Sequence, residues 1–374
     1  MKSLVLTHQY PKKDNLYRSG FIHQRVKEYI NNGIDTEIWV LDDEKSIPET
    51  YVFEGVIVFE GNSEAFISHL EKNEVGKILV HFLKKSTIKA LNLLKLQIPI
   101  IVWVHLFEAS SWHRRLFDCN NVDFLKYIKN NIIQLRSFKR FNENTNLDVT
   151  YVFVSKWIKE IAEKDINTTF KNSYVIHNYI NEDLYQFSSK TADKRKKILS
   201  IRTFQSKKYG NDISAKVIKI LSQKPEFKEM EFALYGKGKY FNKIQKELAH
   251  FPNVKLHDNF LSQDEIAQLH KEYGVFLCPT RQDSQGVSMC EAMSSGLVAV
   301  TSNNSAIPEF VINNKTGLLG NNADEIANLL LFLYQNPGEF TKISEAAAIK
   351  VREQCGLTAT IQKEIQIILK DNLI

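Results

Sequence analysis

Residues 275–302 read VFLCPTRQDSQGVSMCEAMSSGLVAVTS and give the clearest indication of the fold. Its two ends, 275–279 and 298–302, are short apolar runs typical of buried strands. Between them lie a polar loop and a helix that begins near Val287. Buried strands joined by a helix of this length indicate neighbouring parallel strands with a crossover helix.

The same alternation extends outward over most of the chain. Apolar runs that read as strands occur at 3–7, 36–41, 78–82, 99–105, 149–155, 173–178, 198–202, 230–236 and 253–257. The polar segment 185–197 separates the runs into two series and reads as an interdomain linker. The pattern predicts an α/β protein with two doubly wound Rossmann-like domains facing a central cleft. We expect the first domain to span 1–178 and the second to span 179–356.

Composition excludes several other classes of protein. The chain has 374 residues, with 15 Gly and 8 Pro, too few for collagenous or low-complexity architectures. Its four cysteines, Cys119, Cys278, Cys290 and Cys355, form no CxxC pair, which argues against a zinc ribbon or a disulfide scaffold. No signal-peptide core and no run of about 20 apolar residues is present. We therefore expect a cytoplasmic protein.

Charge is uneven along the chain. The 49 basic and 43 acidic residues give a net charge of only +6, but the segment 112–141 carries seven basic and two acidic residues. Within it, Leu125, Ile128, Ile132 and Leu135 recur at helical spacing, with lysines and arginines off that stripe. The stripe could pack on its own domain and leave a solvated basic face. Alternatively, an amphipathic basic helix could lie on an anionic membrane, which would make the protein peripheral on the inner face.

The loop and helix after residue 279 carry groups suited to a phosphorylated ligand. The helix start presents free N–H groups and a positive dipole end to a phosphate. Glu291, in the early helix, can accept hydrogen bonds from ribose hydroxyls, and Asp283, on the loop, can reach another part of the ligand. A purely electrostatic role for both acids at the helix start is the structural alternative.

Cations follow the first strand of the second series. Arg202 stands at the strand end, and Lys207 and Lys208 precede the next helix. Such cations at the carboxyl edge of a parallel sheet can clamp a diphosphate, although Lys207 could equally be an ordinary solvated lysine. Gly236 follows the next strand and is a weak signal, since a lone GxG is often only a turn.

Together these motifs resemble the donor-binding half of the retaining, GT-B-fold glycosyltransferases of family 4. The carrying motif is an acid, Asp283, followed after seven residues by Glu291. The family pattern is also matched by Arg202 with the lysines, the Gly236 turn, Pro308-Glu309 and the segment 316–319. The first half resembles the family more loosely, through Tyr10-Pro11, the loop to Gly20, an HxxE-like His105 to Glu108 and Ile176-His177-Asn178. Two departures stand out: Asp283 replaces the usual Glu, and Ser284-Gln285-Gly286 replaces Gly-Phe-Gly.

The resemblance implies a role for each matching residue. Arg202 and Lys208 would neutralise the leaving diphosphate, Glu291 would hold the ribose, and His105 would line the acceptor side near the sugar. Asp283 and the N–H groups of Gln285 and Gly286 would hold the sugar ring. The remaining donor-binding residues would be Val287, Ser288, Lys207, Gly236 and Gly20. A C-terminal helix, 357–374, would return to the first domain.

The implied activity is retaining, metal-independent hexosyl transfer from a nucleotide sugar to a glycan or lipid-linked acceptor. Uridine diphosphate is the commonest family nucleotide, and the Lys/Asn/Ile-rich composition suggests a bacterial cell-envelope polysaccharide enzyme. No Asp-x-Asp motif or metal-spaced cluster occurs, so we expect no metal and no cofactor; the nucleotide sugar is a substrate. A dinucleotide-dependent oxidoreductase would need a third glycine after Gly238, and this sequence has none at that spacing. A non-catalytic protein that binds phosphorylated or nucleic-acid ligands would leave the Asp283–Glu291 spacing unexplained, and we expect no nucleic-acid partner.

Overall fold

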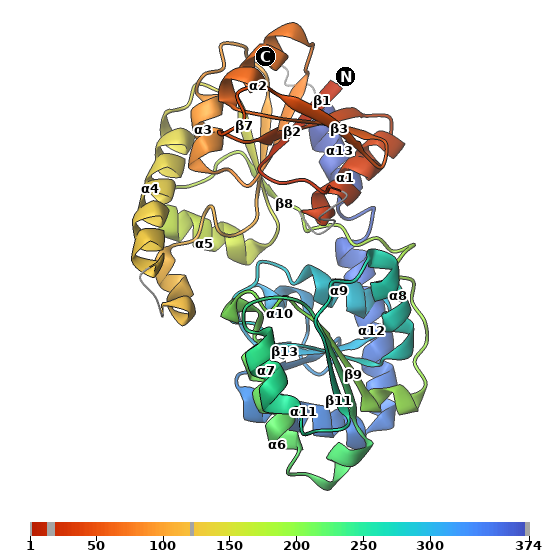
Figure 1. Cartoon of the computed structure of the whole chain (residues 1–374). Helices are drawn as coiled ribbons and strands as arrows, with labels where there is room; N and C mark the ends of the chain where they lie inside the picture. The colour runs from red at the N-terminus through yellow and green to blue at the C-terminus, as the bar shows by residue number, and fades with distance from the viewer. Residues whose placement is uncertain (1, 13–18, 120–122, 371–374) are drawn as a thin grey trace. The chain divides into compact units, whose positions relative to one another are not determined.

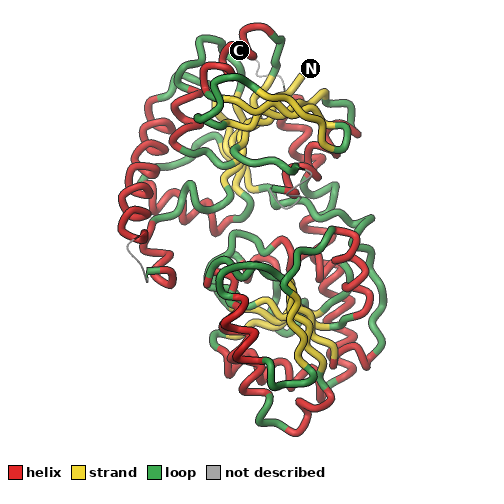
Figure 2. The backbone as a smooth tube through the Cα atoms, viewed as in Figure 1, coloured by secondary structure: helices red, strands yellow, loops and turns green. Residues whose placement is uncertain are grey.

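The computed structural model describes residues 2–12, 19–119 and 123–370, and it divides into two compact units. Unit 1 comprises the described residues of Met1–Arg114, Asn121–Tyr179 and Thr358–Ile374, and unit 2 comprises those of Arg115–Asn120 and Ile180–Leu357. The C-terminal segment therefore belongs to unit 1, whereas the short segment Arg115–Asn120, which the sequence boundaries assign to the first domain, groups with unit 2. Each unit is a sheet with helices packed around it (Figures 1 and 2).

The sheet of unit 1 has eight strands in the order β3-β4-β2-β1-β5-β6-β7-β8. The strands are β1 (Lys2–Thr7), β2 (Asp35–Leu41), β3 (Glu49–Phe53), β4 (Val56–Gly61), β5 (Lys77–His81), β6 (Ile100–Val104), β7 (Val149–Phe153) and β8 (Ser173–Val175). All neighbours pair in parallel except β3 and β4, an antiparallel hairpin that the sequence reading missed. Its two-residue turn, Glu54-Gly55, has positive φ at both positions (45° and 82°), as hairpins of this length favour.

Two groups of helices pack in unit 1. The first group is α1 (Gly20–Asn31) with α13 (Ile361–Leu369), and the second is α2 (Ser63–Lys72), α3 (Lys85–Leu91), α4 (Asp123–Asn144) and α5 (Lys156–Ile166). The last residues of the predicted C-terminal helix, 371–374, lie outside the described residues, as do residues 13–18 of the loop before Gly20. Within the described part, no helix is long and apolar enough to cross a membrane.

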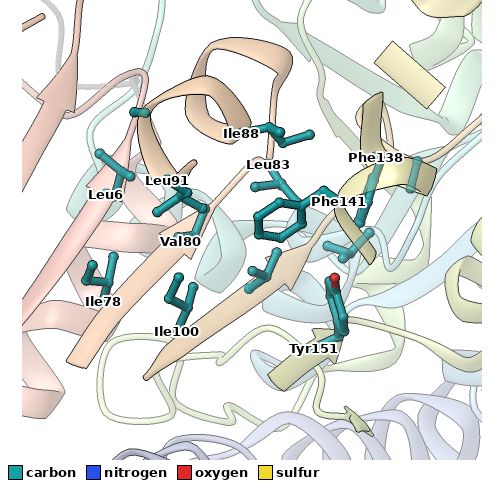
Figure 3. Packing of buried hydrophobic residues seen from close by; sticks show 14 of the residues in the cluster. Leu6, Ile78, Val80, Leu83, Ile88, Leu91, Ile100, Phe138, Phe141 and Tyr151 are labelled. Carbon is teal, nitrogen blue, oxygen red and sulfur yellow. The ribbon is translucent and has the colours of Figure 1, made fainter. Parts of the chain in front are cut away.

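The core of unit 1 lies between the strands and the second helix group. Figure 3 shows side chains from the strands and from α3 and α4 meeting there: Leu6, Ile78, Val80, Ile100, Ile88, Leu91, Phe138 and Phe141. Parallel register brings Leu6 opposite Val80 and Ile78 opposite Ile100. Burial of such a continuous apolar face supplies the main driving force for this half of the chain.

The inward face of α4 differs from the predicted stripe. Its buried residues are Phe124, Asn131, Leu135, Phe138 and Phe141. Only Leu135 of the predicted stripe is among them, while Leu125 is 68% exposed and Ile132 is 36% exposed. The larger aromatic side chains bury more apolar area, so they turn the helix about its axis and leave two aliphatic residues in solvent.

Unit 2 has a fully parallel, six-stranded sheet in the order β11-β10-β9-β12-β13-β14. The strands are β9 (Lys197–Ile201), β10 (Glu231–Tyr235), β11 (Val254–His257), β12 (Val275–Cys278), β13 (Val298–Ser302) and β14 (Leu318–Gly320). The helices are α6 (Asn211–Leu221), α7 (Phe241–Leu248), α8 (Gln263–Glu272), α9 (Val287–Ser294), α10 (Ile307–Phe310), α11 (Ala323–Gln335) and α12 (Pro337–Cys355). The predicted α/β class with two parallel Rossmann-like sheets is therefore confirmed.

The segment 185–197 is not a free linker. Tyr185 is 1% exposed and Lys190 is 3% exposed, both within unit 2. The Lys190 ammonium donates hydrogen bonds to the His270 carbonyl and the Ser188 hydroxyl, each at 2.6 Å. Most of the other residues of this segment are exposed or half-buried, so Tyr185 and Lys190 are the two that fix it against unit 2.

Candidate active site

The carboxyl edge of the unit 2 sheet brings Arg202 and Asp283 together. Strands β9 and β12 are neighbours, so the residues that follow them emerge side by side. Arg202 Nη2 lies 3.5 Å from Asp283 Oδ2, and Arg202 Nη1 donates to Ser288 Oγ at 3.1 Å. Arg202 is only 7% exposed. Its Nε is buried and has no hydrogen-bond partner among the described residues.

Asp283 folds its own loop. Its Oδ1 accepts hydrogen bonds from the N–H of Gly286 at 2.9 Å and of Gln285 at 3.3 Å. Burial would raise the pKa of Asp283, but Lys208, Arg202 and these two N–H groups outweigh it and hold the pKa below its ordinary value. The two N–H groups implied for the sugar ring therefore stabilise the Asp283 carboxylate instead.

Helix α9 begins at a left-handed glycine. Gly286 has φ 78°, a conformation that costs glycine little, and it lets the loop turn directly into the helix. Val287 and Ser288 follow in the first turn, beside Arg202. The helix start and the guanidinium thus face the same region of unit 2.

Lys208 joins this cluster and Lys207 does not. Lys208 is buried, and its Nζ lies 5.1 Å from the centroid of the Tyr209 ring, as does the Arg202 guanidinium carbon. Tyr209, which sequence reasoning missed, therefore holds both cations through its π face. Lys207 instead lines a small separate pocket with Asp212 and Glu247. No motif in the sequence singles out Tyr209 beyond its position next to the lysines.

Glu291 is held in an environment that favours its neutral form. Burial raises the pKa of Glu291 to about 8, and a hydrogen bond with Tyr185 opposes that rise. The Tyr185 hydroxyl itself donates to Gln263 Oε1 at 2.6 Å. Perturbation of this size by desolvation is common where a carboxyl group serves a ligand.

The predicted glycines have different structural roles. At Gly236, with φ 147°, a Cβ atom would lie 2.0 Å from the Arg202 carbonyl oxygen, so only glycine allows this close approach. Gly236 therefore positions the backbone of Arg202. Gly20 begins α1 in unit 1, where a Cβ atom would meet nothing within 4 Å.

His105 lies in unit 1, directly after β6. It is 6% exposed, and its Nε2 lies 3.1 Å from Nδ1 of the buried His81. Burial, together with the nearby positive charge of Arg25, holds the pKa of His105 well below its ordinary value, so the ring is neutral. Glu108 accepts from the N–H of His105 at 2.6 Å and from that of Leu106 at 3.1 Å, which fixes the turn of the HxxE-like segment.

Metal-ligating groups do not gather in the described part of the chain, where no set of three His, Cys, Asp or Glu side chains could hold an ion. The site is instead built from two cations, two carboxyl groups and a helix start. Such a set suits an anionic ligand that also carries hydroxyl groups.

Comparison with known proteins agrees with this chemistry. The family model described as "Glycosyl transferases group 1" matches residues 181–350, which contain the whole unit 2 cluster. A biosynthetic glycosyltransferase for amylovoran, AmsK of Erwinia amylovora, is 29% identical over 171 residues. That match covers 42% of this chain and 40% of AmsK, so the chain spans less than half the length of this relative.

Two solved structures share the fold over almost the full chain. Sucrose-phosphate synthase from Thermosynechococcus elongatus aligns with a TM-score of 0.76 at 13% identity, over 98% of each chain. HepE of Anabaena in complex with UDP-glucose aligns with a TM-score of 0.72 at 15% identity, over 98% of this chain and 99% of HepE. The two-sheet architecture is thus the GT-B fold that these structures share, and the family match spans the residues of the unit 2 cluster.

Proposed function

We propose that this protein is a retaining glycosyltransferase that moves a sugar from a UDP-sugar to a glycan or lipid-linked acceptor in cell-envelope polysaccharide synthesis. The observation that carries the proposal is Arg202, buried at the carboxyl edge of the sheet with an uncommitted Nε beside a helix start. The likeness to AmsK, whose name assigns it to amylovoran biosynthesis, supports the polysaccharide role. HepE, solved with UDP-glucose, supports the uridine nucleotide.

Stabilisation of the leaving group is the main catalytic contribution in this proposal. As the bond from the sugar's anomeric carbon to the phosphate oxygen breaks, charge accumulates on the diphosphate. Arg202 Nε, the Lys208 ammonium and the first N–H groups of α9 bind that charge. Removal of such a donor commonly costs a factor of about 100 to 1000 in rate.

The acceptor proton goes to the departing diphosphate. The acceptor oxygen forms its bond to the anomeric carbon on the face that the phosphate leaves, and the hydroxyl proton passes to the phosphate oxygen. This route requires no protein base and retains the anomeric configuration. Neutral His105 then serves as a hydrogen-bonding group for a sugar hydroxyl rather than as a base.

The two acids have separate roles. Glu291 binds the ribose hydroxyls, and its raised pKa allows it to act as a donor or an acceptor near neutral pH. Asp283, whose Oδ1 is committed to the loop, binds the sugar through Oδ2, the oxygen that faces Arg202. Binding of the sugar to Asp283 would fix the positions of the Arg202 side chain and of the loop that carries Asp283.

A panel of nucleotide sugars tests the proposal. We expect slow hydrolysis of one UDP-sugar in the absence of acceptor, unchanged by EDTA, and transfer that retains the anomeric configuration by proton NMR. Arg202→Gln should lower turnover by about 100-fold or more, while Lys207→Gln, in the separate pocket, is the matched control. Binding of UDP without hydrolysis or transfer of any sugar would favour a non-catalytic binding protein, and an inverted product would exclude the retaining route.

Peripheral membrane binding is a second part of the proposal. Leu125 and Ile132 are exposed on α4 among the exposed cations Lys126, Lys129 and Arg136. An apolar pair flanked by cations matches the requirements of an anionic bilayer surface. We propose that α4 places the enzyme on the inner face of the membrane.

A further inference from the structure

A cavity of about 870 Å³ lies wholly within unit 1 and has no role in the donor chemistry above. Its walls come from the end of β5, the start of α3, the segment around Phe107 and one side of α4. A volume of this size accommodates a ligand of one to three sugar rings. Its lining combines aromatic side chains with polar and charged groups, as sugar-binding sites require.

The cavity walls are built rather than accidental. Gln134 of α4 accepts from the N–H of Lys85 at 2.8 Å and donates to the Leu83 carbonyl at 2.8 Å and the Glu108 carbonyl at 3.1 Å. One side chain therefore joins three segments that are far apart in the sequence. These three hydrogen bonds hold this part of the cavity wall in place.

Phe82 lines the cavity and is strained. It has φ 63°, a left-handed conformation that is a genuine outlier for a bulky aromatic residue. Strain of this kind persists where the surroundings impose it, often at ligand sites. The Phe82 ring also contacts His105, with ring centroids 4.5 Å apart, which puts the cavity one side chain away from the proposed sugar-facing histidine.

The described lining of the cavity carries two lysines and one carboxyl group. Lys84 and Lys85 line it, and neither forms an ion pair with any of the described residues. Desolvation by the cavity wall lowers the pKa of Lys84, opposed by the charge of Glu108. Glu108 is the one carboxyl group in the described lining, and its oxygens already accept two backbone N–H groups.

The histidine in the wall, His8, adds no charge. Burial, with the charge of Lys84, lowers the pKa of His8 to about 4, so this ring is neutral, and its Nε2 lies 2.7 Å from the Thr87 hydroxyl. An anionic ligand is thus the occupant whose charge would offset the exposed pair of ammonium groups.

We infer that this cavity binds the acceptor and that the acceptor carries an anionic group, a phosphate or a carboxylate, held by Lys84 and Lys85. The inference rests on the proposed function, since it assigns the acceptor side of that reaction. The aromatic wall, Phe82 with Phe107 and Tyr127, contacts the apolar face of the sugar ring, while the lysines bind its charge. An uncharged glycan would leave both ammonium groups without a partner.

Calorimetric titration in saturating UDP tests the inference, because UDP occupies the phosphate-binding groups of unit 2. The probes are glucose 1-phosphate, methyl glucuronide and uncharged methyl glucoside. We expect one or both anions to bind and methyl glucoside to bind at least tenfold more weakly. Phosphate and carboxylate acceptors are distinguished by which anion binds more tightly.

Two variants and a control make the result decisive. Lys84→Gln with Lys85→Gln should weaken the anion by at least tenfold, and Asn130→Trp, which fills the cavity from the exposed side of α4, should weaken it as well. Lys89→Gln, exposed on α3 outside the lining, should bind as the parent does. Equal binding by the double variant and the parent, or no binding of either anion, would overturn the inference. If the parent protein does not bind UDP, the donor site proposed in unit 2 is wrong.

Discussion

Arg25 on α1 and Glu364 on α13 form an ion pair in the interior of unit 1. Arg25 Nε lies 3.1 Å from Glu364 Oε1, and the two side chains are 1% and 0% exposed. Glu364 also accepts hydrogen bonds from the Tyr29 hydroxyl at 2.5 Å and from the Trp103 indole at 3.0 Å. The C-terminal helix is therefore anchored to α1 and β6 of the first half of the chain.

Removal of one partner of this pair should destabilise unit 1. Glu364→Ala leaves a buried guanidinium uncompensated, so we expect it to lower the free energy of unfolding by about 3–5 kcal/mol. Arg25→Met combined with Glu364→Leu should be less destabilised than Glu364→Ala, because no buried charge remains. Thermal unfolding followed by circular dichroism measures both, with exposed Lys363→Ala as the control. A Glu364→Ala protein as stable as the parent would contradict this account.

Stability should depend on pH through Glu291. Its folded-state pKa, about 8, lies above the ordinary value of 4.5, so the folded protein binds a proton more tightly than the unfolded chain. The free energy of unfolding contributed by this group therefore falls as pH rises from about 4.5 to 8 and is constant above that range. Glu291→Gln cannot ionise, so its stability relative to the parent should rise across the same window.

Denaturant titrations at pH 5, 7 and 9 would follow that difference, and they need no ligand. Glu353→Gln, exposed on α12, is the matched control substitution. A difference between Glu291→Gln and the parent that stays constant with pH would show that Glu291 keeps an ordinary carboxyl pKa.

The two acids of unit 2 should separate nucleotide binding from transfer. Glu291→Ala removes a hydrogen bond of a neutral carboxyl group, worth about 0.5–1.5 kcal/mol, so UDP should bind about 2- to 12-fold more weakly. Asp283→Ala should leave UDP affinity equal or higher, since Arg202 loses a competing carboxylate, while transfer falls. Calorimetry with UDP and a transfer assay measure the two effects, with exposed Asp258→Ala as the control.

Asp283→Glu refines this test of the loop. Retained or improved turnover would indicate that the longer acid reaches the sugar as in the family the motif resembles. Lost turnover with normal UDP binding would indicate a pocket built around the shorter side chain. Alanine variants at 283 and 291 that both bind and transfer like the parent would rule out the donor-site assignment.

Gly236→Ala should distort the backbone at Arg202. The added methyl group would lie 2.0 Å from the Arg202 carbonyl oxygen, and that backbone atom can move only with its strand. We expect a loss of about 1–3 kcal/mol in stability, together with weaker UDP binding. Gly338→Ala, where the added Cβ meets nothing within 4 Å, should leave both quantities near those of the parent. Unchanged UDP affinity in Gly236→Ala would show that Gly236 does not affect the proposed donor site.

The exposed face of α4 should govern binding to anionic vesicles. Each near-surface cation contributes about 1 kcal/mol, so Lys126→Gln with Lys129→Gln should reduce binding by about thirtyfold. Leu125→Ser should reduce it further by removing buried apolar area. Co-sedimentation with anionic and neutral vesicles measures this, with Lys164→Gln and Lys171→Gln on the same unit as the control. Equal binding to both kinds of vesicle would argue against the membrane surface.

The α/β class, and the region that we propose to bind phosphate, follow from the sequence. The order of strand, polar loop, helix and strand in 275–302 is a local property, because crossover helices follow buried strands wherever a parallel sheet is covered on both faces. The positions of Arg202 and Asp283 directly after strands then follow from topology alone, since carboxyl ends of neighbouring parallel strands share one edge. The hairpin of β3 and β4 was missed although it has a local signal, two short apolar runs, 51–53 and 56–59, on either side of Glu54-Gly55.

The contacts that each side chain makes at that edge depend on the tertiary structure. Whether the N–H groups of Gln285 and Gly286 face a ligand or the Asp283 carboxylate depends on a loop conformation that distant contacts select. The contact of Tyr209 with two cations and the choice of the face that α4 buries likewise result from competition among long-range contacts. A local pattern specifies which elements form, but the free energy of packing, summed over residues far apart in the chain, selects which of their surfaces meet.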